Sequence, residues 1–372
     1  MYKTIPVEEA VGVVLPHDIT EIRKDEFKGR AFKKGHVVKK EDILHLQMLG
    51  KENLYVIEIG EDEMHENDAA YALAEALAGK GVELSGEPVE GKINLIASYD
   101  GLLRVKKDAL AEFNMLGEVM CATLHNNTYV RKGRKLAGTR AIPLVIKKHI
   151  IEKAVRIAKD SGGILEVIPL RKAKVGVVIT GNEVYYKRVK DSFEPIIRAK
   201  MKAIGSSVLR VYFCPDDAEI IKHRIRELIE IGCDLIVTTG GMSVDPDDVT
   251  RVGISQAGAT DVVYGSPVLP GAMFLIAYIS AKERKHGSAE VKKFRDNSIP
   301  ELPTFQTSEP IPILGIPACG MYHKTTIFDL ILPRVLAGEK ITRREISELG
   351  HGGFCLGCKE CRHPVCPFGK GI

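Results

Sequence analysis

The segment from Thr239 to Asp248 carries residue types that suit a polar, phosphate-bearing ligand. It follows the apolar run Leu235–Val237, which predicts a buried strand. Two adjacent glycines at a strand end let the backbone approach a ligand closely and free its N–H groups. Asp245, Asp247 and Asp248 then supply the hard oxygen donors that Mg²⁺ prefers. This combination favours a ligand-binding loop over a packing role.

Four further segments are expected to meet this loop, at residues 180–184, 216–217, 269–271 and 315–320. Two of them also have a simpler interpretation: the segment 180–184 as a plain turn, and the pair Asp216 and Asp217 as a helix cap. Glycine-bearing loops that open helices present free N–H groups to anions, and Asn182 and Ser243 are suited to bind a heterocycle edge. The expected ligand contacts in the five segments are Thr180, Gly181, Asn182, Glu183, Asp216, Asp217, Thr239, Gly240, Gly241, Ser243, Asp245, Asp247, Asp248, Pro270, Gly271, Gly315, Pro317 and Gly320.

Alternating strands and helices from Lys174 onward must position these loops. The apolar runs predict strands at 175–179, 208–212, 235–238, 273–279 and 311–316, and helices at 193–204, 217–231 and 322–336. This alternation predicts a parallel sheet with helices on both faces, whose ligands bind at the carboxyl ends of the strands. The polar stretch 281–309 is interpreted as an inserted surface loop.

The remaining pattern divides the chain into four parts. We expect an N-terminal α+β module at 1–80, with strands at 11–15 and 53–57 and a helix at 69–77. A β-rich domain at 81–172 follows and ends in a helix at 149–159. The α/β domain spans 173–340, and a cysteine-rich tail spans 341–372.

The order of the five segments resembles the molybdopterin-binding superfamily. The series TGNEV, PDD, TGG-x-S with a following Asp and Thr, PG and G-x-P is similar to the molybdopterin molybdenumtransferases more than to the molybdopterin adenylyltransferases. The resemblance implies a three-layer α/β domain flanked by small β-rich domains. It also implies a possible homodimer.

The same resemblance implies ligands and roles. The ligand is molybdopterin, including its adenylated form, and molybdate is joined to its dithiolene with release of AMP. Mg²⁺ is the expected cation, and Asp217 and Asp248 are the expected catalytic carboxylates. The carried-over ligand contacts are Thr180, Glu183, Asp217, Gly240, Gly241, Ser243 and Asp248.

Three departures from the transferase pattern leave an alternative open. Ala272 stands where the transferases have Lys after Pro-Gly, and Pro317–Gly320 replaces their P-G-N-P. Their S-x-x-D-G-x-A segment is not found. The second hypothesis is therefore a molybdopterin carrier that delivers its cargo to a molybdoenzyme or another cofactor-biosynthesis protein.

Four cysteines gather near the end of the chain. Cys355, Cys358, Cys361 and Cys366 follow the spacing C-x2-C-x2-C-x4-C-P, one residue longer than a bacterial ferredoxin run. Four thiolates can bind a [4Fe-4S] cluster or a tetrahedral Zn²⁺, with His363 as an alternative fourth zinc ligand. The longer spacing favours Zn²⁺. A tail without metal is the third interpretation.

Composition excludes several classes of protein. The net charge is +4 over 372 residues, with basic and acidic side chains mixed, which argues against a nucleic-acid binder. No run approaches the ~20 apolar residues of a membrane span. Met1–Pro6 lacks a secretory signal core, so we expect a cytoplasmic protein, in which eight cysteines do not predict a disulfide scaffold.

Overall fold

The structure is a computed structural model that describes residues 2–23, 27–57, 59–242, 245, 248–280 and 310–371. Ser243, Asp247 and the polar stretch 281–309 lie outside the described residues. The chain divides into two compact units, Met1–Ile168 and Pro169–Ile372. No helix in the described ranges has both the length and the apolar character to cross a membrane.

The first unit begins with a small module that has its own core. Val7, Leu15 and Leu46 are fully or almost fully buried in it. The predicted strand at 11–15 is wrong: only an isolated bridge joins Val14 to Val37. Gly12 has a φ of +89° there, which breaks an extended strand. The elements are β1 (Tyr2–Pro6), a short 3₁₀ turn (Val7–Glu9), β2 (Ile19–Arg23), β3 (Phe27–Phe32), α1 (Asp42–Met48) and β4 (Asn53–Ile57).

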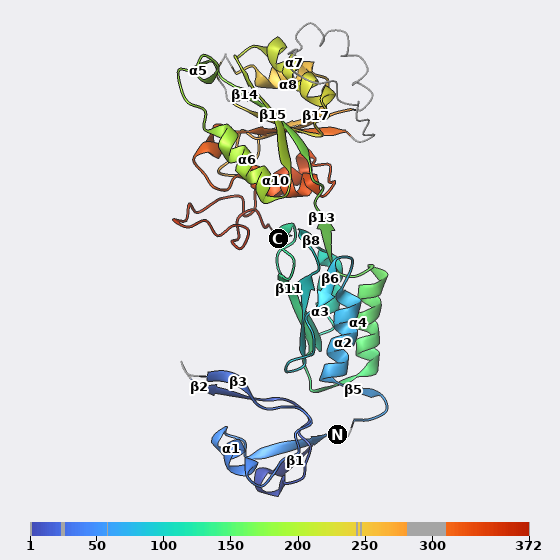
Figure 1. Ribbon diagram of the computed structural model, residues 1–372. Helices are drawn as coiled ribbons and strands as arrows, with labels where there is room; N and C mark the ends of the chain where they lie inside the picture. Colours follow the sequence, from blue (N-terminus) through green and yellow to red (C-terminus); the bar gives the residue numbers. More distant parts are fainter. Residues whose placement is uncertain are drawn as a thin grey trace. The chain divides into compact units, whose positions relative to one another are not determined.

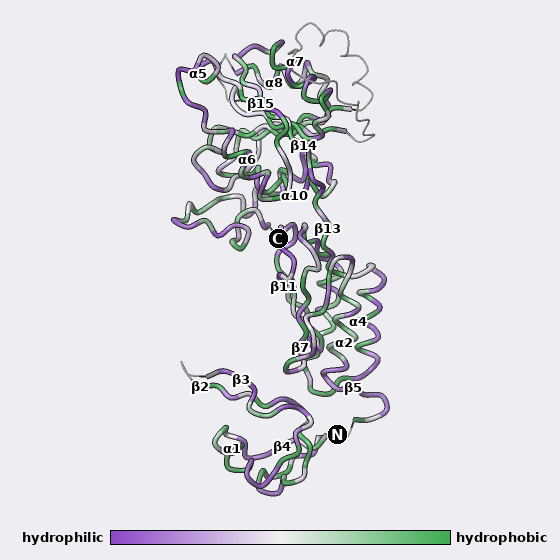
Figure 2. Tube along the Cα trace, viewed as in Figure 1, coloured by the Kyte–Doolittle hydropathy of each residue, from purple (hydrophilic) through white to green (hydrophobic). Residues whose placement is uncertain are grey.

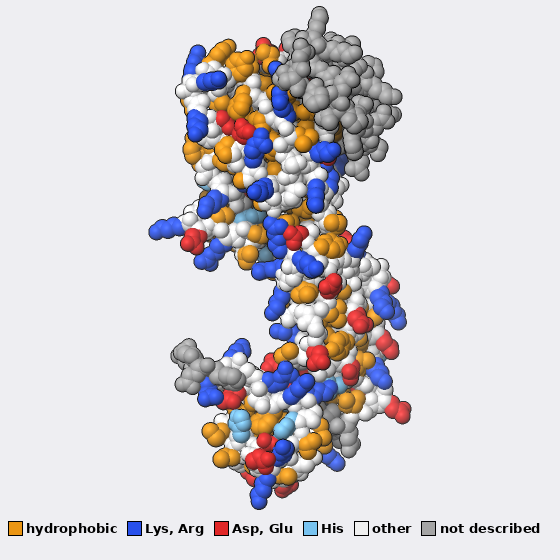
Figure 3. Space-filling view, viewed as in Figure 1, with side chains coloured by type: hydrophobic (Ala, Val, Ile, Leu, Met, Phe, Trp, Pro, Cys, Tyr) orange, Lys and Arg blue, Asp and Glu red, His pale blue; other side chains and the backbone are white. Residues whose placement is uncertain are grey.

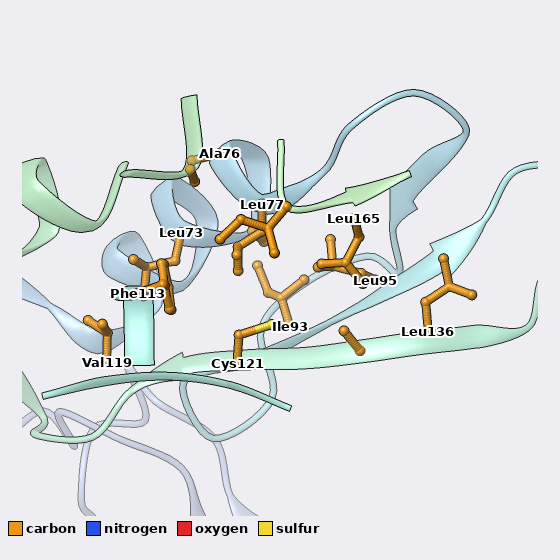
Figure 4. Close-up of a cluster of buried hydrophobic side chains, with 14 of the residues drawn as sticks. Leu73, Ala76, Leu77, Ile93, Leu95, Phe113, Val119, Cys121, Leu136 and Leu165 are labelled. Carbon is orange, nitrogen blue, oxygen red and sulfur yellow. The ribbon is translucent and has the colours of Figure 1, made fainter. Parts of the chain in front are cut away.

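The rest of the first unit packs helices on an antiparallel sheet of order β6-β7-β11-β9. Leu73 and Leu77 of one helix meet Ile93 and Leu95 of the sheet in a continuous apolar core (Figure 4). The elements are β5 (Glu63–His65), α2 (Glu66–Leu77), β6 (Val82–Leu84), β7 (Lys92–Ala97), β8 (Gly101–Val105), α3 (Lys107–Asn114), β9 (Val119–Thr123), β10 (Thr128–Val130), β11 (Lys135–Ala141), β12 (Val145–Lys147), α4 (Lys148–Asp160) and β13 (Leu165–Pro169). Hydrophilic and hydrophobic residues alternate along α4, as expected for a helix with one face on a core (Figure 2).

The second unit is built on a six-stranded sheet of order β15-β14-β16-β19-β18-β17. The first four strands in this order are parallel, and β18 runs antiparallel to β19 and to β17. The strands are β14 (Lys174–Thr180), β15 (Ser207–Cys214), β16 (Leu235–Thr239), β17 (Ala259–Tyr264), β18 (Leu275–Ile279) and β19 (Ile311–Ile316). β14 and β16 are buried along nearly their whole length, as central strands covered on both faces must be.

Helices cover both faces of this sheet (Figure 1). α6 (Phe193–Ala203) and α10 (Ile327–Leu336) pack on one face, and α7 (Ala218–Glu230) and α8 (Thr250–Gln256) pack on the other. The shorter elements are α5 (Asn182–Tyr185), the 3₁₀ turn η4 (Ala318–Met321) and α11 (Arg343–Glu348). The predicted three-layer α/β class is confirmed for this unit.

Local sequence explains where the main helices begin. Ile221, Ile225 and Leu228 recur at helical spacing and are fully buried, so α7 presents one apolar stripe to the sheet. The Asp217 carboxylate accepts hydrogen bonds from the N–H groups of Glu219 and Ile220, at 2.9 and 3.0 Å, and so caps this helix. A capping box between Thr326 and Asp329 starts α10 five residues later than the sequence predicts.

Candidate functional site

Three parallel strands end at the same level on one edge of the sheet. Ile179 of β14 pairs with Thr239 of β16, and Thr239 pairs with Ile316 of β19. β18 is antiparallel, so its first residue, Leu275, lies beside Gly315 at this same edge. The loop before β18 therefore reaches the carboxyl ends of the other strands, although it precedes its own strand.

The strand order changes direction at β14. The chain passes from β14 to β15 on one side and then returns to β16 on the other side of β14. Such a switch point leaves a crevice outside the carboxyl ends of the two central strands, which is the common ligand position in open α/β sheets. Thr180 ends β14, and Thr239 ends β16.

The turn of Gly240 and Gly241 needs glycine at both positions. Their φ angles are +83° and +54°. A Cβ at Gly240 would collide with the Thr180 carbonyl oxygen, and a Cβ at Gly241 would collide with the Thr250 hydroxyl. The turn therefore packs directly on the end of β14. This close approach keeps the floor of the crevice free of side chains.

A cleft of about 410 Å³ opens over this turn. Six of the residues predicted from the sequence line it: Thr180, Glu183, Gly240, Gly241, Asp248 and Pro317. Its apolar walls come from Ile179, Val184, Val189, Phe193, Met242, Met273, Ile316, Ala318, Met321 and Tyr322. A concave, largely apolar site with a few carboxylates suits a flat heterocycle that carries hydrogen-bond donors.

The Asp248 carboxylate is held by its own loop. The Asp245 N–H donates to Asp248 Oδ2 at 3.2 Å, and the Asp248 N–H donates to the Asp245 carbonyl at 3.0 Å. The Asp245 side chain is exposed and does not line the cleft. Asp248 therefore lines the cleft and is hydrogen-bonded to Asp245, whose own side chain is exposed to solvent.

A second hollow of about 460 Å³ adjoins the first and shares Met273, Pro317 and Ala318 with it. The predicted residues Pro270 and Gly271 line this second hollow. Its other described lining residues are Leu269, Ala272, Cys319, His323, Phe354 and Cys355. The two hollows therefore meet at Met273, Pro317 and Ala318, beside the strand ends.

The Cys319 thiol is half-buried at this second hollow. Burial raises its pKa above the ordinary value, which keeps the protonated form at neutral pH.

Besides Asp245, seven predicted contacts lie off both clefts. Asp216 accepts a hydrogen bond from the Asn182 N–H at 3.0 Å, which ties the β14 loop to the β15 loop. Asp217 caps α7. The other five are Gly181 at the start of α5, Asn182 itself, Thr239 behind the glycine turn, Gly315 inside β19 against Met242, and Gly320 buried in η4. The Thr239 hydroxyl is fully buried and has no hydrogen-bond partner among the described residues.

The cleft also contains residues that the sequence did not mark. Lys190 and Asp191 lie on the connection between α5 and α6 and line the cleft beside Phe193. Asp191 accepts hydrogen bonds from the N–H groups of Phe193 and Glu194 at 3.0 and 2.8 Å, so it fixes the start of α6. Among the described lining residues, Lys190 is the only cationic side chain. No motif signals it, because its position depends on how this connection folds back over the strand ends.

The predicted metal ligands do not form a preformed metal centre. Within the described part of the chain, no three His, Cys, Asp or Glu side chains are arranged to hold a metal ion. Asp247, a predicted Mg²⁺ ligand, lies outside that part. Cys355 and Cys366 are half-buried, and Cys358 and Cys361 are exposed.

Charged side chains of both signs are interspersed on the visible surface of each unit (Figure 3). This distribution agrees with the near-neutral net charge of +4.

Comparison with known proteins matches the second unit to a named family. Residues 176–336 match the family described as "Probable molybdopterin binding domain". Residues 4–58 match a family described only as a domain of unknown function. The first match covers nearly all of the sheet β14 to β19, the glycine turn and the first cleft, while Phe354 and Cys355 of the second hollow lie beyond it.

Curated relatives match over a short region. A "CinA-like protein" of Mycobacterium avium is 37% identical over 96 residues, which is 26% of this chain and 22% of the relative. A "CinA-like protein" of Mycobacterium tuberculosis is 38% identical over 78 residues, which is 21% of this chain and 18% of the relative. The chain thus spans about a fifth of the length of these relatives.

Solved structures show weaker likeness. The tungsten cofactor synthesizing protein MoaB from Pyrococcus furiosus is 17% identical, with a TM-score of 0.28, and the match covers 45% of this chain and 97% of that one. A molybdenum cofactor biosynthesis protein from the same organism is 14% identical, with a TM-score of 0.25, over 92% of this chain and 66% of that one. The family match, with the order of its motifs along the strand ends, places residues 176–336 in the molybdopterin-binding superfamily.

Proposed function

We propose that the second unit binds molybdopterin in the cleft over Gly240 and Gly241 and completes the cofactor by molybdenum insertion. The observation that carries this proposal is the glycine turn packed on Thr180 at the switch point of the sheet. Two carboxylates, Glu183 and Asp248, line the same cleft as this turn. Residues of this kind, at this position, suit a flat ligand that enters along the strand ends.

The pterin ring fits the character of the first cleft. Its amino group and ring N–H are donors, and carboxylates such as Glu183 and Asp248 are acceptors. The faces of the ring are apolar, and the side chains of Phe193, Met242 and Tyr322 line the same cleft. Recognition by carboxylates and apolar side chains therefore accounts for its mixed lining.

The second hollow offers room for the remainder of an adenylated ligand. It continues from the first cleft past Pro317 to Pro270 and Gly271. His323 lines this hollow and Lys190 lines the first. These side chains are the available partners for phosphate or molybdate, because Ala272 occupies the position where the transferases have lysine.

The carboxylates of the glycine loop suit Mg²⁺ by their chemistry. Asp248 and Asp245 supply oxygen donors, and Asp247 belongs to the same loop. A bound Mg²⁺ would neutralise phosphate charge on the ligand. Of the two expected catalytic carboxylates, we assign the reaction to Asp248, because it lines the cleft while Asp217 caps α7.

The second candidate function is a carrier that binds molybdopterin and delivers it without chemistry. Ala272 and the segment Pro317–Gly320 favour it, because both differ from the transferase pattern at the second hollow. The receiving partner would be a molybdoenzyme or another cofactor-biosynthesis protein.

The test is AMP release from adenylated molybdopterin, with and without molybdate, using anaerobically purified protein. Molybdate-dependent release that falls in Asp248→Asn supports the transferase. Asp261→Asn is the control, because Asp261 lies on edge strand β17 and lines neither cleft. Tight binding without release supports the carrier, and absence of binding contradicts both.

A further inference from the structure

The four cysteines of the C-terminal segment face one hollow. Cys355, Cys358, Cys361 and Cys366 all line a hollow of about 360 Å³. Its other wall is the connection Tyr322–Thr325, ahead of α10. His363, the alternative zinc ligand, is not among the described residues that line it. The structure thus brings together the four thiols that the sequence only spaces along the chain.

Both ends of this segment are anchored to the second unit. Before it, the Leu269 N–H donates to the Gly353 carbonyl and the Cys355 N–H donates to the Leu269 carbonyl, each at 2.8 Å. After it, the Gly369 N–H donates to the Gly352 carbonyl at 2.9 Å, and Phe368 is buried. The thiols therefore lie on a loop that is closed at its base.

The loop between these anchors has little to hold it. From Cys355 to Lys370 it forms only turns and bends, seen as an irregular segment in Figure 1. Phe368 is its only fully buried side chain among the described residues. Segments with so small a core are usually held by disulfides or by a structural metal.

We propose that Cys355, Cys358, Cys361 and Cys366 bind one zinc ion. The donor set fits, because Cys₄ with C-x2-C spacing is a common tetrahedral zinc site. The sulfurs share a hollow but do not converge on one point. Zinc binding must therefore draw the loop inward. The exposed Cys358 and Cys361 are the thiols that must shift, and Cys361 Sγ then exchanges its 3.1 Å hydrogen bond with Thr325 Oγ1 for the metal.

Zinc at this place also supports a wall of the second hollow. Phe354 and Cys355 line that hollow beside Leu269, to whose carbonyl the Cys355 N–H donates. A zinc ion that holds the loop in one conformation also holds Phe354 and Cys355 in place. The zinc site stands without the proposed function, while its effect on ligand binding rests on it.

The first test is metal analysis of the full chain, loaded with zinc and dialysed. We expect a colourless protein with one zinc per chain. The variant Cys358→Ser/Cys361→Ser should lose it, because even changes in outer-shell partners weaken zinc sites by about 10–100-fold. Both side chains are exposed, so their loss removes no core packing. Cys319→Ser, which lies outside the segment, should keep its zinc.

Three results would overturn the proposal. They are a wild-type protein that retains no zinc, a brown protein with iron and acid-labile sulfide in place of zinc, and a double variant that keeps full zinc. Because metal content is measured without cofactor or substrate, these results do not depend on the proposed function.

Limited proteolysis tests the closed loop separately. Lys359 and Arg362 are exposed trypsin sites within it. A chelator should accelerate cleavage at both sites, and added zinc should restore protection. Equal cleavage in the loaded and chelated proteins would show that zinc does not hold this loop.

Discussion

The hydroxyl oxygens of Thr180 and Thr250 lie 2.8 Å apart in the interior of the second unit. Thr180 ends β14 and Thr250 begins α8, and the Gly240–Gly241 turn passes against both. The Thr180 hydroxyl also donates to the Thr239 carbonyl at 3.1 Å. This buried chain of hydrogen bonds joins the three elements that shape the floor of the cleft.

Replacing either threonine by valine should destabilise this unit. Thr180→Val leaves the buried Thr250 hydroxyl without this partner, and Thr250→Val removes one of the two hydrogen bonds of the Thr180 hydroxyl. Each loss should cost about 1–3 kcal/mol. The double variant Thr180→Val/Thr250→Val should cost less than the sum of the two. Urea unfolding of the four proteins measures the coupling. The pair Thr180 and Thr260, whose hydroxyls bond to different partners, is the additive control, and additivity for Thr180 and Thr250 would contradict the link.

Gly240→Ala should lower the free energy of unfolding more than a glycine-to-alanine substitution at Gly205, where the backbone strain is similar. Gly205 has a φ of +77°, close to the +83° of Gly240, but a Cβ there meets nothing within 4 Å. Both changes share the cost of a left-handed alanine. Only Gly240→Ala adds a collision with the Thr180 carbonyl, about 1–3 kcal/mol more. Chemical unfolding compares them, and equal losses would mean that the close packing at Thr180 is unimportant.

The core of the second unit could be predicted from the sequence, because its apolar residues follow clear helix and strand patterns. The helix at 193–204 and the Asp217-capped helix agree with α6 and α7 to within one residue. The buried strands β14 and β16 are largely apolar runs, each followed directly by a glycine. These local signals are set by burial and capping, which a single sequence records directly.

Other features depend on contacts that leave no local signal. β17 was not predicted, because half of its residues are exposed and Asp261 has a φ of +51°. The reversed direction of β18 is set by its partner β19. Asp216 and Asp217 were expected at the cleft, but they bind the neighbouring loop and a helix end. Lys190 lines the cleft only because of how the connection between α5 and α6 folds.

Asp217→Asn and Asp248→Asn separate a structural carboxylate from a functional one. Asparagine is as good an N-cap as aspartate, so Asp217→Asn should change the free energy of unfolding little, by less than about 1 kcal/mol. If the assignment to Asp248 is right, Asp217→Asn should also keep molybdopterin binding, while Asp248→Asn loses it. Isothermal titration with molybdopterin measures both. Loss of binding in Asp217→Asn, with unchanged stability, would contradict this assignment and favour the functional role that the sequence predicts for Asp217.

Ala272→Lys should strengthen anion binding at the second hollow. Ala272 is exposed and lines that hollow, so a lysine there fits without displacing the core. The new charge should tighten molybdate or phosphate binding and should raise any molybdate-dependent AMP release. Ala272→Gln is the neutral control of similar length. An identical response to both variants would show that charge at this position does not limit the reaction.

Alkaline pH should destabilise the second unit through two buried thiols. Burial raises the pKa of Cys214 and of Cys233 from 9.0 to about 12. Between these values the folded thiols keep protons that the unfolded chain has released, so stability is fully present below pH 9 and falls as pH rises toward 12. The slope approaches about 1.4 kcal/mol per pH unit for each thiol. Urea unfolding at a series of pH values measures it. Cys214→Ala/Cys233→Ala should be less stable at neutral pH but should show a shallower alkaline slope, and an unchanged slope would mean that other groups cause the loss.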